Sequence, residues 1–206
     1  NRYHFCGTTE DGQYVVLNTS TGTDGNSLHV KSLKGNGADW MPLVEGFTHH
    51  SSVVEHVNGA LYMLTDIDAP RYRLVAADPS DPSNTSLWRD VLPESEDLLE
   101  SVSVVGGQLW AIYLHNASNR VVRCDLDGSN PRVVSLPSEV GSVGGFGIAL
   151  TDIASSAFAA LTGAAFFGGA WIQNRCSQIE FPQLRKSSDE NSTFRILAVY
   201  ANSKSL

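Results

Sequence analysis

The chain is poor in basic residues, in cysteine and in long aliphatic runs. Only 14 of its 206 residues are Lys or Arg, against 22 Asp or Glu, which gives a net charge of −8. A nucleic-acid interface needs clustered basic side chains to neutralise phosphates, and the basic residues here are scattered along the chain. We therefore expect no nucleic-acid partner.

The three cysteines, Cys6, Cys124 and Cys176, lie far apart. An odd number without paired spacing indicates neither a disulfide framework nor a zinc site. We expect them to be small buried residues of a protein in a reducing compartment. The N-terminal stretch has no apolar run of the kind a signal peptide needs, so we expect a cytoplasmic location. Because the sequence does not begin with Met, we interpret it as a fragment or a processed chain.

One uncharged segment, residues 154–172, is nearly long enough to cross a bilayer. It consists largely of Ala, Gly and Ser rather than Leu, Ile and Val, and Asp152 directly precedes it. A membrane anchor is therefore the weaker interpretation, and it depends on this segment alone.

Histidine and aspartate pairs do not form a recognisable metal motif. His49 and His50 are adjacent, so in a strand their side chains point to opposite faces. The Asp-x-Asp pairs in residues 66–70 and 125–128 are typical of turns and lack the further oxygen ligands of a calcium loop. We expect no metal and no cofactor.

A repeat runs through the chain. A turn followed by an apolar strand appears as "DGQYVVL" from Asp11, "NGALYML" from Asn58 and "GGQLWAI" from Gly106, with a weaker copy, "SSAFAAL", from Ser155. The copies start about 47 to 49 residues apart, a period typical of propeller blades. Three further strands accompany each copy, bounded by Gly, Asp, Asn and Pro. They are "SLHVKSL", "WMPLVEG" and "SVVEHV" after the first copy, "YRLVAAD", "WRDVLPE" and "LESVSVV" after the second, "RVVRCDL", "PRVVSLP" and "SVGGFGI" after the third, and "AWIQNRC", "IEFPQLR" and "RILAVY" after the weak copy.

Four strands per unit and no amphipathic helix predict an all-β fold. We expect a β-propeller of about four blades, each a sheet of four antiparallel strands. Four blades can close into a ring, whereas part of a larger ring would leave two blade faces uncovered. The sequence leaves both arrangements open.

The residues also resemble a known family. The run "TDIDAPRYRL", residues 65–74, is similar to the family's Thr-Asn-x-x-(Ala/Ser)-Pro-x-(Tyr/Phe)-Arg-Leu, with Asp66 in place of Asn. "YLHNA", residues 113–117, and "GSVGG", residues 141–145, match two further family motifs. On these motifs the chain resembles the propeller domain of prolyl oligopeptidase, from about Asp11 to Gly147. The resemblance implies that the chain holds roughly the last four blades of a seven-bladed ring.

Beyond Gly147 the resemblance fades. We expect residues 1–147 to form propeller blades and residues 148–206 to form a divergent or irregular last blade with a C-terminal tail. Members of this family carry a Ser–Asp–His triad on an α/β-hydrolase domain, and the nucleophile needs a G-x-S-x-G turn. The chain has no such motif, so we expect it to contain no hydrolase domain and no catalytic residue.

The resemblance implies a gating role. The propeller would restrict access of short proline-containing peptides to a hydrolase domain of the same parent protein, its expected partner. Arg71, Arg73 and Arg120 are candidates for lining a channel through which peptide carboxylates pass. The alternative is a stand-alone β-propeller that binds other proteins.

Overall fold

The computed structural model describes residues 1–34, 39–136, 142–150, 175–179 and 194–201. Three four-stranded antiparallel sheets follow one another along the chain, and a three-stranded sheet comes after them. The first sheet contains β1 (Tyr3–Thr8), β2 (Tyr14–Ser20), β3 (Asn26–Ser32) and β4 (Met41–Val44). The second contains β5 (Ser51–Val57), β6 (Ala60–Thr65), β7 (Arg73–Ala77) and β8 (Arg89–Leu92). The third contains β9 (Leu98–Val105), β10 (Gln108–His115), β11 (Ser118–Asp125) and β12 (Arg132–Val134). A short 3-10 helix, η1 (Thr85–Leu87), precedes β8.

These three sheets are the predicted blades, here called blades 1, 2 and 3. The strands expected within and after the first three repeat copies are confirmed, each within a few residues of its predicted start. Within each blade the strands pair in chain order. Asn58 and Gly59 join β5 to β6 with positive φ angles of 50° and 84°, the geometry of a tight two-residue hairpin.

The first repeat copy differs from the others in its turn. The strand β1 was not anticipated from the sequence, and Thr9 to Tyr14 close a four-residue hairpin loop, whereas β5–β6 and β9–β10 have two-residue turns. If the copies are aligned by placing Gly12 opposite Gly59, the residues of β2 are therefore displaced by one position relative to those of β6. Because side chains alternate along a strand, that shift exchanges the faces. Val16, not Val15, packs towards blade 2.

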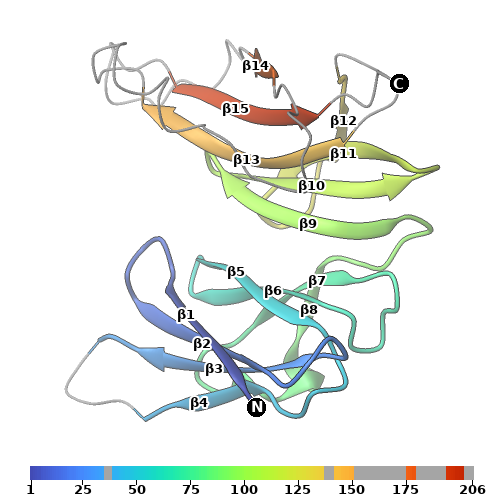
Figure 1. Cartoon of the computed structure of the whole chain (residues 1–206). Coiled ribbons are helices and arrows are strands. Elements are labelled where there is room, and N and C mark those ends of the chain that lie inside the picture. The colour runs from blue at the N-terminus through green and yellow to red at the C-terminus, as the bar shows by residue number, and fades with distance from the viewer. Residues whose placement is uncertain (35–38, 137–141, 151–174, 180–193, 202–206) are drawn as a thin grey trace.

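The blades follow one another as stacked sheets (Figure 1). An apolar cluster lies at each junction. Leu28 and Val30 of blade 1 pack with Leu61, Met63 and other residues of blade 2. The core between blades 2 and 3 includes Tyr62, Leu74, Leu99, Leu109 and Tyr113. Trp110, fully buried, packs with Val143 beyond blade 3. The first strands β5, β9 and β13 contact one another in sequence, so they lie closest to the common axis, as in a propeller.

The last sheet has an arrangement that the repeat did not predict. It contains β13 (Ser142–Leu150), β14 (Arg175–Ile179) and β15 (Phe194–Ala201), and β13 pairs with β15 along its length. β15 contains "RILAVY", which the sequence predicts as the last strand of the fourth unit, but it lies between β13 and β14 instead of starting a further sheet. The run is rich in β-branched and aromatic residues, which favour sheet positions. The weak copy from Ser155 lies outside the described residues.

The cysteines only partly follow expectation. Cys124 is buried, and that burial raises the pKa of its thiol to about 11. Cys6 is exposed, so the prediction of a buried residue is wrong there, because β1 is exposed at all six positions. The described parts of the chain contain no helix long and apolar enough to cross a membrane, and residues 154–172 lie outside them.

Candidate functional site

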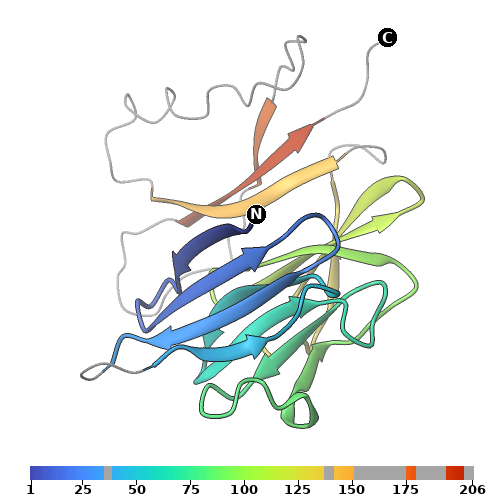
Figure 2. The same cartoon turned by 60° about the horizontal axis from the view of Figure 1, so that its bottom comes forward.

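The strand order gives the propeller arc two faces. We use the name start face for the face at which the first strand of each blade, β1, β5 or β9, begins. It carries the hairpins β2–β3, β6–β7 and β10–β11 and the links between blades. The opposite face carries the β1–β2, β5–β6 and β9–β10 turns and the β3–β4, β7–β8 and β11–β12 connections. Figure 2 shows the blades from a second direction. Polar contacts join neighbouring blades on both faces.

Asn26 joins blades 1 and 2 on the start face. Its side-chain amide donates to the carbonyl of Ser51 at 2.9 Å, and its Oδ1 accepts the N–H of Ser51, also at 2.9 Å. The main-chain N–H of Asn26 donates to the carbonyl of His49 at 2.9 Å. Both Asn26 and Ser51 are buried. One side chain therefore satisfies the first main-chain groups of the next blade's innermost strand, where water has little access.

The next two blade junctions have a hydrogen bond at the equivalent position of the start face, but different acceptor groups make it. The carbonyl of Arg71 accepts the N–H of Leu99 at 3.0 Å, which joins blade 2 to blade 3. At the following junction, Oδ1 of Asn119 accepts the N–H of Val143 at 2.6 Å. Each contact runs from the β2–β3 type of hairpin to the start of the next first strand. The recurrence indicates that the start face fixes the spacing of the blades.

A hydrogen bond between a histidine and an aspartate joins blades 1 and 2 on the opposite face. Nδ1 of His56 lies 2.6 Å from Oδ2 of Asp11, and the His56 side chain is only 8% exposed. Asp11 also accepts hydrogen bonds from the Thr9 hydroxyl and the Gln13 N–H. The hydrogen bond with His56, followed by that from Thr9, lowers the pKa of Asp11 to about 2. The pair holds the β1–β2 turn against β5.

This pair predicts a loss of stability at acid pH. The pKa of Asp11 lies below its ordinary value of 3.8, so its contribution is present above that value and is lost as pH falls from about 4 to about 2. In urea unfolding, wild type should be more stable than Asp11→Asn at neutral pH. The difference should shrink through that window.

Asp24→Asn is the matched control for this pair. Asp24 is exposed, and no hydrogen bond to its side chain occurs within the described residues. Its difference from wild type should stay constant over the same pH range. An Asp11→Asn difference that persists unchanged at pH 2 would show that the carboxylate does not stabilise the junction.

Blades 2 and 3 are also joined on the opposite face. The hydroxyl of Tyr62 donates to the carbonyl of Leu126 at 2.8 Å. Two residues further on, Gly128 has a positive φ of 85°, and a Cβ at that position would overlap the carbonyl oxygen of Val91. Only glycine allows this close approach of two main chains at that φ.

The three candidate channel arginines occupy two kinds of position. Arg73 and Arg120 are paired with Thr65 and Tyr113 in equivalent places of blades 2 and 3, and both belong to third strands rather than to the innermost ones. Arg71 precedes β7, and its main chain serves the blade junction. The positions of these arginines do not test whether they contact a peptide, so that contact stays a prediction.

Both strand arginines pair with aspartates. Nη1 of Arg73 lies 3.2 Å from Asp90 Oδ1, and Nη2 of Arg120 lies 2.5 Å from Asp97 Oδ2. Asp97 also lies 2.8 Å from Nδ1 of His115. The hydrogen bond with His115, aided by the nearby positive charges, lowers the pKa of Asp97. This carboxylate therefore stays ionised and orders the β8–β9 link on the start face.

Sequence reasoning missed the residues that join the blades. A signal was present for one class of contact, because Asn26 and Asn119 each stand at or near the start of a third strand. The Asp11–His56 pair spans 45 positions, and no local pattern connects them. No group of three or more His, Cys, Asp or Glu is placed to hold a metal ion in the described ranges.

Comparison with known proteins agrees with this architecture. A family model described as prolyl oligopeptidase, N-terminal beta-propeller domain, matches residues 1–151. The match begins earlier than the motifs had indicated and includes β1. The prolyl endopeptidase of Elizabethkingia meningoseptica is 35% identical over 146 residues, which cover 71% of this chain and 20% of that protein.

Solved structures show the same relationship. A prolyl endopeptidase studied for inter-domain dynamics in catalysis and specificity is 31% identical with a TM-score of 0.63, over 69% of this chain and 20% of its own. Prolyl oligopeptidase B from Galerina marginata is 25% identical with a TM-score of 0.62, over 72% of this chain and 21% of its own. The chain thus spans about a fifth of the length of these relatives. With its repeat, its blades and the match over residues 1–151, the chain belongs to the prolyl oligopeptidase N-terminal β-propeller family.

Proposed function

We propose that this chain is the gating portion of a prolyl-oligopeptidase-like serine peptidase. It restricts access to a Ser–Asp–His hydrolase domain of the same parent protein and contributes no catalytic residue. Short proline-containing peptides pass, and folded proteins do not. The observation that supports this proposal most is that blades 1 and 2 are joined on both faces of the arc. Asn26 joins them on the start face, and His56 joins them on the opposite face.

A gate that selects by size must not spread when a large molecule presses on it. Apolar cores between blades resist sliding, because close-packed interiors transmit strain. The hydrogen bonds of Asn26 and the contact of Gly128 with Val91 resist separation at the faces. Access therefore depends on the dimensions of the opening, and selection by access adds to discrimination at the chemical step.

The arginines retain a proposed part in this gate. Arg120 is 41% exposed although it pairs with Asp97, so its guanidinium can also reach solvent. Guanidinium groups bind carboxylates in a bidentate manner. We propose that Arg71, Arg73 and Arg120 assist the passage of acidic peptides, and that Asp90 and Asp97 keep the arginines ordered between passages.

A hybrid enzyme tests the gate. Residues 1–151 replace the matching stretch of the E. meningoseptica prolyl endopeptidase, and kcat/KM is measured for one proline-containing sequence in two forms. One form is a short peptide, and the other is the same sequence in an exposed loop of a stable folded protein. We expect the hybrid to cleave the peptide and to cleave the folded protein at least 100-fold more slowly, because the loop cannot pass the blades.

The control substrate is the folded protein after denaturation and digestion, which frees the loop. It should be cleaved like the short peptide. A hybrid that cleaves the peptide and the folded protein equally well would contradict the gating function. The hybrid's activity on the short peptide shows in the same experiment that its hydrolase domain is intact.

A further inference from the structure

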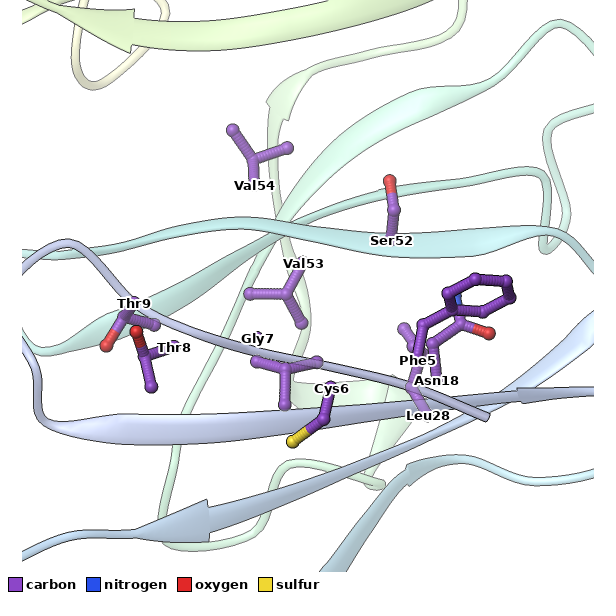
Figure 3. A pocket seen from close by; sticks show the side chains of 11 residues that line it. Phe5, Cys6, Gly7, Thr8, Thr9, Asn18, Leu28, Ser52, Val53 and Val54 are labelled. Atoms are coloured by element: carbon purple, nitrogen blue, oxygen red, sulfur yellow. The ribbon is translucent and has the colours of Figure 1, made fainter. Parts of the chain in front are cut away.

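A cavity of about 270 Å³ lies between blades 1 and 2, beside the two innermost strands. Figure 3 shows it running along β1 from Phe5 to Thr9, with Val53 of β5 directed towards β1. Leu28 of β3 and Val16 of β2 also line it. The cavity therefore lies between two stacked blades near the axis and opens to solvent along the exposed strand β1.

Gly7 lines the cavity without contributing a side chain. It pairs with Val16 on the β1–β2 ladder, and a Cβ at Gly7 would meet no atom within 4 Å. Tyr62 in blade 2 and Trp110 in blade 3 occupy the position equivalent to Val16. Tyr62 pairs with Glu55, and Trp110 pairs with Ser103. Blade 1 alone of the three has no side chain at the position that Gly7 occupies, and the cavity lies beside it.

The lining of the cavity is mixed: aliphatic and aromatic side chains lie beside one amide, the hydroxyls of Thr8, Thr9 and Ser52, and the thiol of Cys6. Val16, Leu28 and Val53 contribute aliphatic surface, and the Phe5 ring, 67% exposed, stands at one end. Asn18 lies opposite Phe5 on the neighbouring strand, and within the described residues no partner is recorded for its side-chain amide. None of the lining residues carries a charge. A charged group would lose its hydration there without a compensating partner.

The adjacent strand carries an irregularity. The register of β5 on β6 shifts between Val53 and Glu55, which leaves Val54 without an opposite residue on β6. Such bulges are over-represented beside active sites, where they re-aim a side chain. Val54 itself lines the cavity.

We propose that this cavity binds one uncharged aliphatic residue of a peptide, with the Asn18 amide hydrogen-bonding to the peptide main chain. The space fits one side chain, since pockets for whole drug-sized ligands begin at about 300 Å³. An amide that can both donate and accept suits a peptide group. The inference rests on the proposed function in one respect: peptides must reach the axis of the blades.

The test uses the 206-residue chain and a named probe, N-acetyl-L-leucinamide, in a titration followed by ¹H–¹⁵N NMR. A ligand of this size in a matching pocket should bind with a Kd on the order of 1 mM. We expect shifts concentrated at residues 5–9 and 52–54. The charged counterpart, N-acetyl-L-glutamate amide, should bind at least tenfold more weakly.

Gly7→Val fills the cavity without strain, because the site is open and Val favours strands. It should weaken leucinamide binding at least tenfold while leaving the melting temperature equal or higher, so lost binding cannot come from unfolding. Gly22→Val is the matched control, another glycine with open space around it, and it should bind as wild type does. Asn18→Ala should weaken binding about threefold to tenfold, as the loss of one hydrogen bond does.

Equal binding to wild type and Gly7→Val would overturn the proposal, and so would the absence of localised shifts at about 10 mM probe, ten times the expected Kd. The result is independent of the hybrid enzyme's size selection. If the probe binds but the hybrid cleaves folded proteins freely, the gating function fails and the pocket stands. If the hybrid selects but no probe binds, only the pocket fails.

Discussion

Gly128→Ala should destabilise the chain by about 3 kcal/mol or more. The added Cβ would overlap the carbonyl oxygen of Val91, so either the β11–β12 connection or β8 must move. Overpacking of this kind costs about 1–3 kcal/mol, and a non-glycine residue at positive φ adds about 1 kcal/mol. The movement would also strain the nearby Tyr62–Leu126 hydrogen bond. The effect is large because two main chains, not a flexible side chain, meet at this point.

Gly59→Ala separates the two causes. Gly59 has nearly the same φ, 84°, but nothing lies within 4 Å of a Cβ there, so only the backbone strain of about 1 kcal/mol applies. Urea unfolding monitored by tryptophan fluorescence gives both values. Equal losses for the two variants would mean that blades 2 and 3 do not approach closely at Gly128.

Asn26→Ala should destabilise the chain by about 2–4 kcal/mol. It removes two hydrogen bonds of 2.9 Å and leaves the N–H and the carbonyl of Ser51 without their partner in a buried place. Each buried group left unsatisfied costs about 1–3 kcal/mol. Hydrogen exchange at the N–H of Ser51 should also accelerate, because the start of β5 is no longer held to blade 1.

Asn84→Ala is the control for this variant. Its amide makes one hydrogen bond, to Asp81, in the exposed β7–β8 connection, so its loss should stay within about 0.5 kcal/mol. If Asn26→Ala is as mild as Asn84→Ala, water replaces the lost contacts, and the start face does not fix the blade spacing.

The fold was predictable from the sequence where the pattern is local and repeated. Turn residues such as Asn58 and Gly59, followed by alternating apolar residues, determine each hairpin within a few positions. The repeat then multiplies that signal, which is why the strands of blades 2 and 3 were found. The exception in blade 1 is instructive, because Gly12 looked equivalent to Gly59 but sits in a longer turn.

The contacts between blades were less predictable, because they join residues distant in sequence. Asp11 and His56, or Gly128 and Val91, meet only when sheets are stacked. The arginines illustrate the converse. Arg73 and Arg120 were selected for a channel by residue type, whereas their equivalent positions on third strands follow from the register alone. The cavity at Gly7 was not predictable either, since β1 itself was missed.

The most direct test of the account combines the hybrid enzyme with Asn26→Ala. If the joined blades form the gate, loosening the junction between blades 1 and 2 should raise kcat/KM for the folded substrate at least tenfold. For the short peptide, kcat/KM should stay within about twofold, because the peptide already passes the gate. An unchanged ratio of the two values, although hydrogen exchange at Ser51 shows the junction loosened, would contradict the claim that the joined blades select by size.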